Sequence, residues 1–226
     1  MKIIHPRTSR AGMTLLEASV SSALLFLVLG TLAHALTGVR DVTNSEGVKA
    51  QLQSSGERAL EMIISDLRAS GFSTVGGIDY PVLFENGAAP NGLAEHVHSP
   101  APKEARPSDS DFGPNREIVF RLPADADGDG RPDVTVDGQV IWDAREFSYV
   151  VINDPDGVNR LERRIDGVAA QRVASWVERI VFDDAASSGF VVPLNSIRVR
   201  IDFRRPDDNG LQMRHSVEAS VRTRNG

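Results

Sequence analysis

The hydrophobic and polar positions divide the chain into an apolar segment near its beginning and an alternating pattern toward its end. From Ala18 to Val39 the sequence contains no Lys, Arg, Asp or Glu. At about 1.5 Å per helical residue this stretch is about 33 Å long, enough to cross the hydrocarbon core of a bilayer. Lys2, Arg7 and Arg10 precede it, and basic residues before a spanning helix hold that end on the cytoplasmic side. The pattern predicts a single membrane-spanning helix with the C-terminal part of the chain outside the cytoplasm.

A second helical pattern follows directly and is amphipathic. Its apolar residues recur at helical spacing, with charged residues between them, at Leu52, Leu60, Ile63, Ile64 and Leu67. We expect this helix to lie on a core and to end near Ser70-Gly71, with the glycine as its cap. Gly47 and Gly56 should be weak points, because glycine is a poor helix former.

The pattern in the rest of the chain predicts an irregular connection followed by strands. Residues 72–115 are rich in Gly, Pro, Ser and Ala and predict a long connection with a short strand around Tyr80–Phe84. Alternating or β-branched residues then predict strands at Glu117–Leu122, Gln139–Asp143, Glu146–Ile152, Arg160–Ile165, Trp176–Phe182, Ser196–Phe203 and Met213–Arg222. Hairpin turns are expected at Asp137-Gly138, Asp166-Gly167 and Asn209-Gly210. A long N-terminal helix packed on a mainly antiparallel sheet gives an α+β fold.

Composition and charge narrow the functional classes. The 226 residues carry a formal net charge of -6 and no long run of Lys or Arg, which argues against nucleic acid as a partner. The absence of cysteine excludes disulfides, thiolate metal sites and a Cys nucleophile. The sequence contains neither a Gly-x-Ser-x-Gly elbow nor a phosphate-binding Gly-x-x-x-x-Gly-Lys-Ser/Thr loop. We therefore predict that the chain is not an enzyme.

Glu17 is the residue near the apolar stretch that most needs an explanation. A carboxylate so close to an apolar core is costly and should have a partner or a task. An uncleaved signal anchor, or a secretory signal peptide cut near Ala33-His34-Ala35, accounts for the apolar stretch alone. Neither alternative gives the carboxylate a role.

The residues around Glu17 resemble the prepilin cleavage motif of type IV pilins and type II secretion pseudopilins, on the run Gly12-Met13-Thr14-Leu15-Leu16-Glu17. The resemblance implies that a prepilin peptidase cuts after Gly12 and methylates the new N-terminus at Met13. It also implies that Glu17 pairs with the terminal amine of a neighbouring subunit. The chain would then sit in the inner membrane with a single span before joining a pilus or pseudopilus. Its partners would be other pilin or pseudopilin subunits and the inner-membrane assembly platform.

Two positions depart from the pattern of this family. Met13 stands where the usual residue is Phe, and His34 stands where major pilins often have a helix-bending Pro. A looser resemblance to PilW-like minor pilins and J-type minor pseudopilins covers Gly157–Arg163, Val173–Phe182 and the final Arg-Asn. It implies a minor subunit that acts at the filament tip in priming or contact.

With this resemblance the chain divides into five segments. They are a basic leader (1–12), a transmembrane and assembly helix (13–39), an amphipathic helix (40–71), an irregular connection (72–115) and a β-rich domain (116–226).

A dense acidic motif lies in the predicted β-rich domain, formed by Asp125, Asp127, Asp129, Gly130, Arg131 and Asp133. Acids at loop positions 1, 3, 5 and 9 with glycine at position 6 match the first part of an EF-hand-type calcium loop, and Arg131 would offer its backbone carbonyl at position 7. The glutamate of position 12 is missing, since Val136 occupies it and Asp137 comes one place later. The motif predicts a weak, structural calcium site. A solvated acidic turn is the alternative.

The remaining candidates have plainer interpretations. His96 and His98 could share a transition metal, but a third ligand is missing nearby, so polar loop residues are the simpler interpretation. His215 is expected to pack or to lie at the surface, and Trp142 and Trp176 to pack in the core. The rival to the pilin-like interpretation is a membrane-anchored or secreted calcium-binding domain of other function, or an enzyme of unrecognised type.

Overall fold

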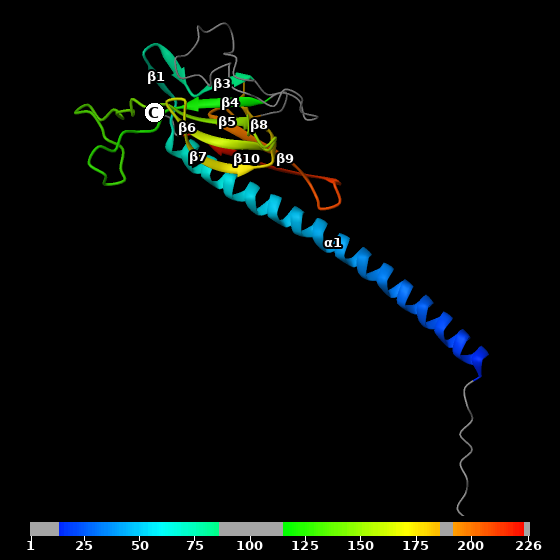
Figure 1. Ribbon diagram of the computed structural model, residues 1–226. Helices are drawn as coiled ribbons and strands as arrows, with labels where there is room; N and C mark the ends of the chain where they lie inside the picture. The colour runs from blue at the N-terminus through cyan, green and yellow to red at the C-terminus, as the bar shows by residue number, and fades with distance from the viewer. Residues whose placement is uncertain (1–13, 86–114, 186–191, 224–226) are drawn as a thin grey trace, which may run out of the picture. The chain divides into compact units, whose positions relative to one another are not determined.

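The computed structural model describes residues 14–85, 115–185 and 192–223 (Figure 1). Over these ranges one helix, α1 (Leu15–Ala69), precedes ten strands. The strands are β1 (Ser73–Val75), β2 (Ile78–Tyr80), β3 (Val82–Glu85), β4 (Arg116–Phe120), β5 (Phe147–Asn153), β6 (Asn159–Ile165), β7 (Val168–Ser175), β8 (Val177–Asp183), β9 (Ser196–Pro206) and β10 (Gln212–Arg222). The chain forms two units, residues 1–46 and 47–226, and the sheet belongs to the second.

The predicted α+β architecture is confirmed. An eight-stranded sheet has the order β10-β9-β8-β4-β5-β6-β7, with β3 paired to β4 beside this path. The pairing of β4 with β8 is parallel, and the other pairings in this sheet are antiparallel. β1 and β2 form a separate two-stranded sheet. The path ends at β7 on one side and at β10 on the other, and β3 pairs with β4 alone, so β3, β7 and β10 are edge strands.

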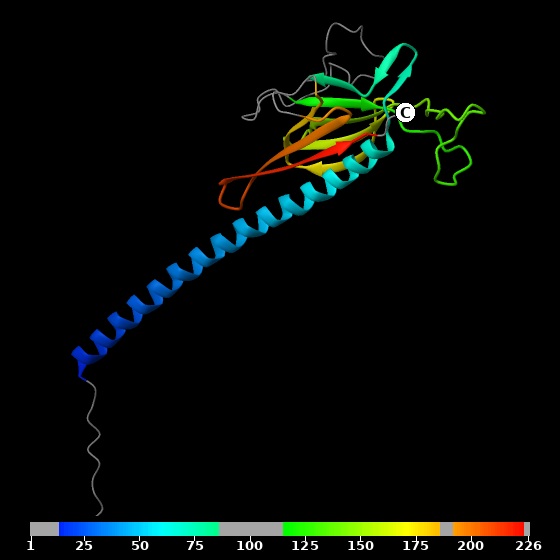
Figure 2. The same cartoon turned by 180° about the vertical axis from the view of Figure 1, so that it is seen from behind.

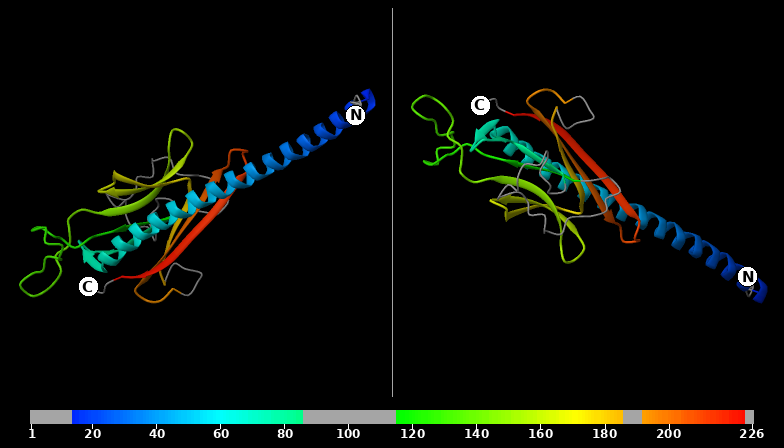
Figure 3. Two further views of the ribbon diagram at one scale, coloured as in Figure 1. Left: turned by 90° about the horizontal axis from the view of Figure 1, so that it is seen from below. Right: turned by 90° about the horizontal axis from the view of Figure 1, so that it is seen from above.

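The C-terminal half of α1 packs on the sheet through one narrow stripe. The stripe recurs every three or four residues, at Val48, Leu52, Gly56, Ala59, Ile63 and Leu67, all of which are buried. Figures 2 and 3 show this part of the helix, in cyan, running along the sheet beside the β9–β10 hairpin. Because residues three and four apart share one face of a helix, the sequence pattern alone places these side chains together.

Gly56 lies where α1 approaches the β9–β10 hairpin closely. A Cβ atom at this position would lie 2.9 Å from Cγ1 of Val217 and 3.0 Å from Cε2 of Phe203. The expectation that Gly56 weakens the helix therefore missed its main role, because only glycine leaves room for β9 and β10 at this height. Leu60 and Ile64, expected in the core, are only partly buried at its edge.

Aromatic rings fill the middle of the core beneath the helix. Phe120 stacks on Phe147 and Tyr149, with ring centroids 6.0 Å apart in both pairs. Phe182 lies next to Tyr149 at 6.4 Å. These rings come from β4, β5 and β8, so the core joins strands that are distant in sequence.

One carboxylate fastens the last turns of α1 to the sheet. Oδ2 of Asp66 accepts hydrogen bonds from the hydroxyl of Tyr149 on β5 and from Nε of Arg163 on β6, both at 2.7 Å. Burial of Tyr149 and the neighbouring Asp66 carboxylate raise the pKa of the tyrosine hydroxyl far above its ordinary value. The helix is therefore held at this end by a charged anchor as well as by apolar contacts. It ends at Ala69, where the hydroxyl of Ser70 donates to the carbonyl of Leu67 at 3.0 Å.

A second buried tyrosine ties β2 to the main sheet. The hydroxyl of Tyr80 donates to Oε1 of Glu146, which Arg121 also contacts at 3.3 Å. Burial and the bond to Glu146 raise the pKa of Tyr80 to about 12. The segment 72–85, predicted as an irregular connection with one short strand, thus contains three strands fixed to the domain.

The predicted strands agree with the structure where alternation is strong and fail where it is not. Gln139–Asp143 forms only isolated bridges, Val134 with Val140 and Pro123 with Trp142. β7 was not predicted, because its small and polar residues lie at an exposed edge. The Asp166-Gly167 turn between β6 and β7 is confirmed, with φ of 49° and 75°, as a type I′ hairpin requires.

β9 alternates as expected, with one correction. Ile197, Val199, Ile201 and Phe203 are buried. Asp202, expected to face outward with its neighbours, is also fully buried and accepts hydrogen bonds from Arg179 at 3.0 Å and Arg200 at 2.9 Å. The other face of this strand is therefore covered by an ionic network rather than by water alone.

The close approach at Gly56 predicts a substitution series along one helix. Gly56→Ala should lower the free energy of unfolding by about 1–3 kcal/mol, because the new methyl group overpacks the stiff Val217 side chain. Gly47→Ala is the matched control, since nothing lies within 4 Å of its Cβ position. It should raise stability by about 0.5–1 kcal/mol. Urea unfolding of the full chain in detergent measures both, and equal effects of the two substitutions would contradict the packing assignment.

The two tyrosines predict loss of stability at alkaline pH. Their folded pKa values are raised, so the neutral hydroxyls stabilise the fold fully below the unfolded pKa of about 10 and less as pH rises above it. Ultraviolet absorbance should therefore show no tyrosinate at pH 10 until the protein unfolds; tyrosinate in the folded state at that pH would contradict it. Tyr149→Phe should cost about 1 kcal/mol at neutral pH and make the alkaline decline shallower.

Candidate functional site

The first part of α1 is apolar on every side. Residues from Leu15 to Val42 are exposed around the whole helix, including Leu24, Leu25, Phe26, Leu27 and Leu29. A window of this helix is long and apolar enough to cross a membrane, and none of that window is buried within the described chain. A helix that is apolar all round belongs in a protein core or a bilayer, and here the described residues form no core around it.

Polar side chains within this apolar stretch bond to their own helix. The hydroxyls of Ser19 and Ser22 donate to the carbonyls four residues earlier, at 2.9 and 2.8 Å. Thr31 and Thr37 donate to the carbonyls three residues earlier, at 2.9 and 2.8 Å. These four hydroxyls are thus satisfied locally, which is what an apolar solvent requires of polar groups.

Glu17 lies in the first turn of α1, where Thr14 acts as the N-cap. The backbone N–H of Glu17 donates to Oγ1 of Thr14 at 3.3 Å. Thr-x-x-Glu is the pattern of a capping box, and an acid in the first turn also interacts favourably with the helix dipole. Glu17 therefore has a local task in starting the helix. Its side chain is exposed and has no ion-pair partner within residues 14–85, 115–185 and 192–223.

The cleavage motif is only partly visible. Gly12 and Met13 lie outside the described residues, and so do His96 and His98. The structure therefore shows how Glu17 lies at the start of the helix, and the cleavage position itself is outside the described residues.

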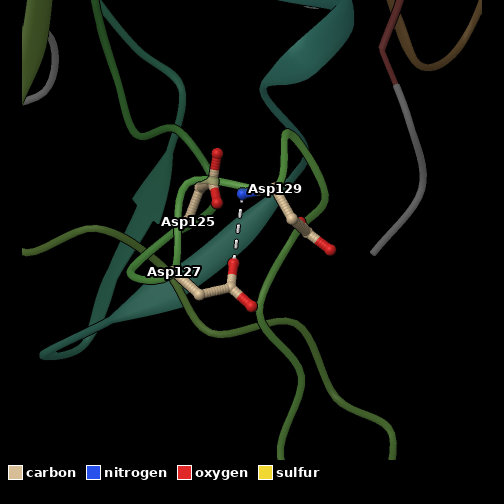
Figure 4. Close-up of side chains that lie close together, drawn as sticks. All are labelled: Asp125, Asp127 and Asp129. Atoms are coloured by element: carbon tan, nitrogen blue, oxygen red, sulfur yellow. Dashed lines mark hydrogen bonds between the residues drawn. The ribbon is translucent and has the colours of Figure 1, made fainter.

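The acidic motif forms a compact loop between β4 and β5. Oxygen atoms from Asp125, Asp127 and Asp129 lie within 4.8 Å of one another (Figure 4). Oδ2 of Asp125 accepts from the N–H of Gly130 at 3.1 Å, which closes the loop from its first to its sixth position. The φ angles of Gly128 and Gly130 are +75° and +79°, so glycine is needed at both turns. The loop predicted from the sequence thus brings three of its carboxylates close together.

The other predicted ligands stand apart from this cluster. Oδ2 of Asp133 accepts from the N–H of Ala126 at 2.9 Å and so holds the end of the loop to its start. Oδ1 of Asp129 accepts from the N–H of Arg131 at 2.8 Å, which fixes the backbone at position 7. Val136 is fully exposed. The three clustered carboxylates are also exposed, as acidic turns without an ion commonly are.

Charges next to the loop are already paired. Arg145 donates to Oδ2 of Asp143 at 2.5 Å, and this bond holds the pKa of the Asp143 carboxyl below its ordinary value. Trp142, predicted in the core, is only half-buried beside the loop. Asp143 is therefore committed to its arginine, and the open carboxylates of this region are those of the loop.

Trp176 differs most from its expected place. It was predicted inside a strand, but it lies between β7 and β8 with φ of +65°, half-buried at the edge of the core. No pattern in the sequence marks a tryptophan for the left-handed region, because that conformation is imposed by the strands on either side. His215 is half-buried on β10 opposite Phe203, as expected of a packed residue.

Comparisons of the chain with models of protein families, with curated proteins and with solved structures found no match. The described residues include the two candidate sites expected from the sequence, an apolar helix with Glu17 in its first turn and an acidic loop with three convergent carboxylates. The first can enter an apolar phase, and the second can hold a hard cation.

Proposed function

We propose that the chain is a minor pilin or pseudopilin subunit of a type IV filament or a type II secretion-like machine. The observation that carries the proposal is the order of features along α1. A basic leader precedes a prepilin-like motif that ends at Glu17, an apolar helical stretch follows, and the same helix continues into a stripe that packs on a β-rich domain. An ordinary anchor needs the apolar stretch but not the motif.

The mechanism is physical rather than catalytic. The apolar helix leaves the bilayer for a bundle of similar helices from other subunits, which keeps its side chains away from water. Glu17 guides this step, because a carboxylate in a low dielectric is stabilised by a cation, and the freed amine of a neighbouring subunit supplies one. The β-rich domain stays outside the cytoplasm and offers surfaces for contact at the filament tip.

Processing gives the direct test. In protein recovered from membranes of its native host, we expect the chain to begin at Met13 and to carry the mass of one added methyl group. Intact mass and N-terminal sequencing measure both. A chain that keeps residues 1–12, or one cut near Ala35, would overturn the proposal in favour of an anchored or secreted domain.

Glu17→Gln separates processing from assembly: it should leave insertion intact and lower the assembled fraction about tenfold, the effect of about 1.4 kcal/mol. Asp41→Asn, beyond the apolar stretch of the same helix, is the control and should assemble normally.

We further propose that the loop from Asp125 to Asp133 holds a structural calcium ion. The convergence of three carboxylates supports this proposal, because they would repel one another without a cation. The ion would act as a clip for a domain that has no disulfides. With the twelfth ligand missing, the affinity belongs to the weak, extracellular range of about 10⁻⁴–10⁻³ M.

Calcium should raise the stability of the full chain in detergent. At ten times the dissociation constant we expect about 1.4 kcal/mol of added stability, measured by urea unfolding, together with saturable binding by calorimetry. Asp127→Asn combined with Asp129→Asn should abolish both effects. Asp137→Asn combined with Asp208→Asn changes the charge equally outside the cluster and should preserve both. Equal losses in the two double variants would show only non-specific attraction of the cation to an acidic protein.

A further inference from the structure

A groove lies between the packed part of α1 and the sheet edge at β7. Its volume is about 470 Å³. Leu52, Met62 and Val173 contribute apolar surface to its lining, and Arg58, Arg172 and Arg205 contribute charge. All of its lining residues belong to the unit formed by residues 47–226. We refer to it as the α1–β7 groove.

The charge of the α1–β7 groove is opposite to that of the protein. The chain carries a net charge of -6, yet the lining contains three arginines and no Asp or Glu. A positive surface on an acidic protein attracts anionic partners. The groove is therefore electrostatically distinct from the acidic loop.

Two of the arginines are bonded only to neutral acceptors. Nε of Arg58 donates to the carbonyl of Ser54 at 3.2 Å, and a terminal nitrogen of Arg205 donates to Oε1 of Gln51 at 2.6 Å. Within the part of the chain that the structure describes, neither forms an ion pair, whereas Arg172 contacts Asp154 at 2.5 Å. A guanidinium group has five donors and binds carboxylates through paired, charge-assisted bonds. Arg58 and Arg205 thus retain the capacity for a carboxylate ligand.

Trp176 lines the groove in a conformation that is costly for its residue type. Its φ of +65° lies in the left-handed region, which bulky residues rarely adopt. The strands hold it there, since its N–H donates to the carbonyl of Asn159 at 2.8 Å and its carbonyl accepts from Arg204 at 2.9 Å. The guanidinium of Arg205 lies 5.6 Å from the ring centroid. Strained residues cluster at ligand-binding and active sites, so the conformation of Trp176 supports a binding role for the groove.

The edge strand itself is poorly suited to pair with another strand. β7 has register irregularities opposite Leu161/Glu162 and Arg163/Arg164. Such bulges blunt an edge against strand addition. A ligand in the α1–β7 groove is therefore recognised mainly by side chains.

We propose that the α1–β7 groove binds an acidic polypeptide segment of a partner protein, with carboxylates on Arg58 and Arg205 and an apolar side chain against Trp176. The apolar part of the lining, with Leu52 and Met62, favours a peptide that carries both carboxylates and apolar side chains over a small inorganic anion. The inference concerns the β-rich unit and stands whether or not α1 enters a filament. The partner is inferred from the charge of the α1–β7 groove and from its apolar lining.

The test uses the full chain in detergent with Trp142→Phe as background, so that Trp176 is the sole fluorescent tryptophan. The probe is an acetylated peptide of alternating Glu and Leu, and the matched probe has Lys in place of Glu. We expect the acidic probe alone to change the Trp176 fluorescence in a saturable way that weakens with added salt. Arg58→Gln combined with Arg205→Gln should lower the affinity about tenfold or more.

Arg68→Gln combined with Arg222→Gln is the control, because it removes the same charge outside the groove. Its affinity should stay within about twofold of the parent, since distant exposed charges are screened. Circular dichroism of both double variants checks that the fold is kept. The proposal is overturned by equal binding of the two probes, by equal losses in the two double variants, or by the absence of a saturable change. Competition by inorganic phosphate as effective as that by the acidic peptide would overturn it in favour of a small-anion site.

Discussion

The close approach of α1 to the β9–β10 hairpin at Gly56 determines how the rest of the domain is arranged. A helix that carried a side chain there would have to stand farther from the sheet, and the larger residues of the stripe could no longer reach the aromatic core. Val48 and Leu52 on one side of Gly56, and Ile63 and Leu67 on the other, are buried because the backbone in the middle is bare. One missing side chain thus lets four larger ones bury their surface, which is the dominant favourable contribution to folding.

Charged groups act at the borders of that apolar contact. Asp66 on α1 bonds to two strands, and Glu146 accepts a hydrogen bond from the hydroxyl of Tyr80 on β2. Asp202 on β9 accepts hydrogen bonds from one arginine on β8 and one on β9. Buried ion pairs contribute little net stability, but a carboxylate left alone among them would be strongly destabilising. These networks therefore favour one register and one helix position over near alternatives. Their arginines are satisfied within the domain, in contrast to Arg58 and Arg205.

Much of the fold could be predicted from the local sequence pattern, because in these segments the pattern follows from a single physical requirement, such as a buried face or a tight turn. Ile197 to Phe203 alternate because one face of β9 is core, and Asp166-Gly167 turns because two positive φ angles suit that pair. β7 could not be predicted, since an exposed edge strand has no apolar periodicity. Gln139–Asp143 has the sequence pattern of a strand, but it forms only isolated bridges because no neighbouring strand extends its pairing. For the site, the spacing of the acids identified the loop, and the same spacing could not tell that Asp133 would bond to Ala126 instead of joining the cluster. The α1–β7 groove escaped sequence reasoning altogether, because its residues come from three distant segments and its tryptophan owes its conformation to tertiary structure.

The stripe that begins at Val48 also decides where the chain can be divided. A fragment that starts at Gly47 keeps every buried residue of α1 and leaves behind the part that is apolar on all sides. A fragment that starts at Gln51, about one turn later, loses Val48, and one that starts at Gln53 also loses Leu52. The apolar surface of the sheet that is then uncovered favours aggregation. The designer of a water-soluble form therefore has to choose its first residue within less than two turns of a single helix.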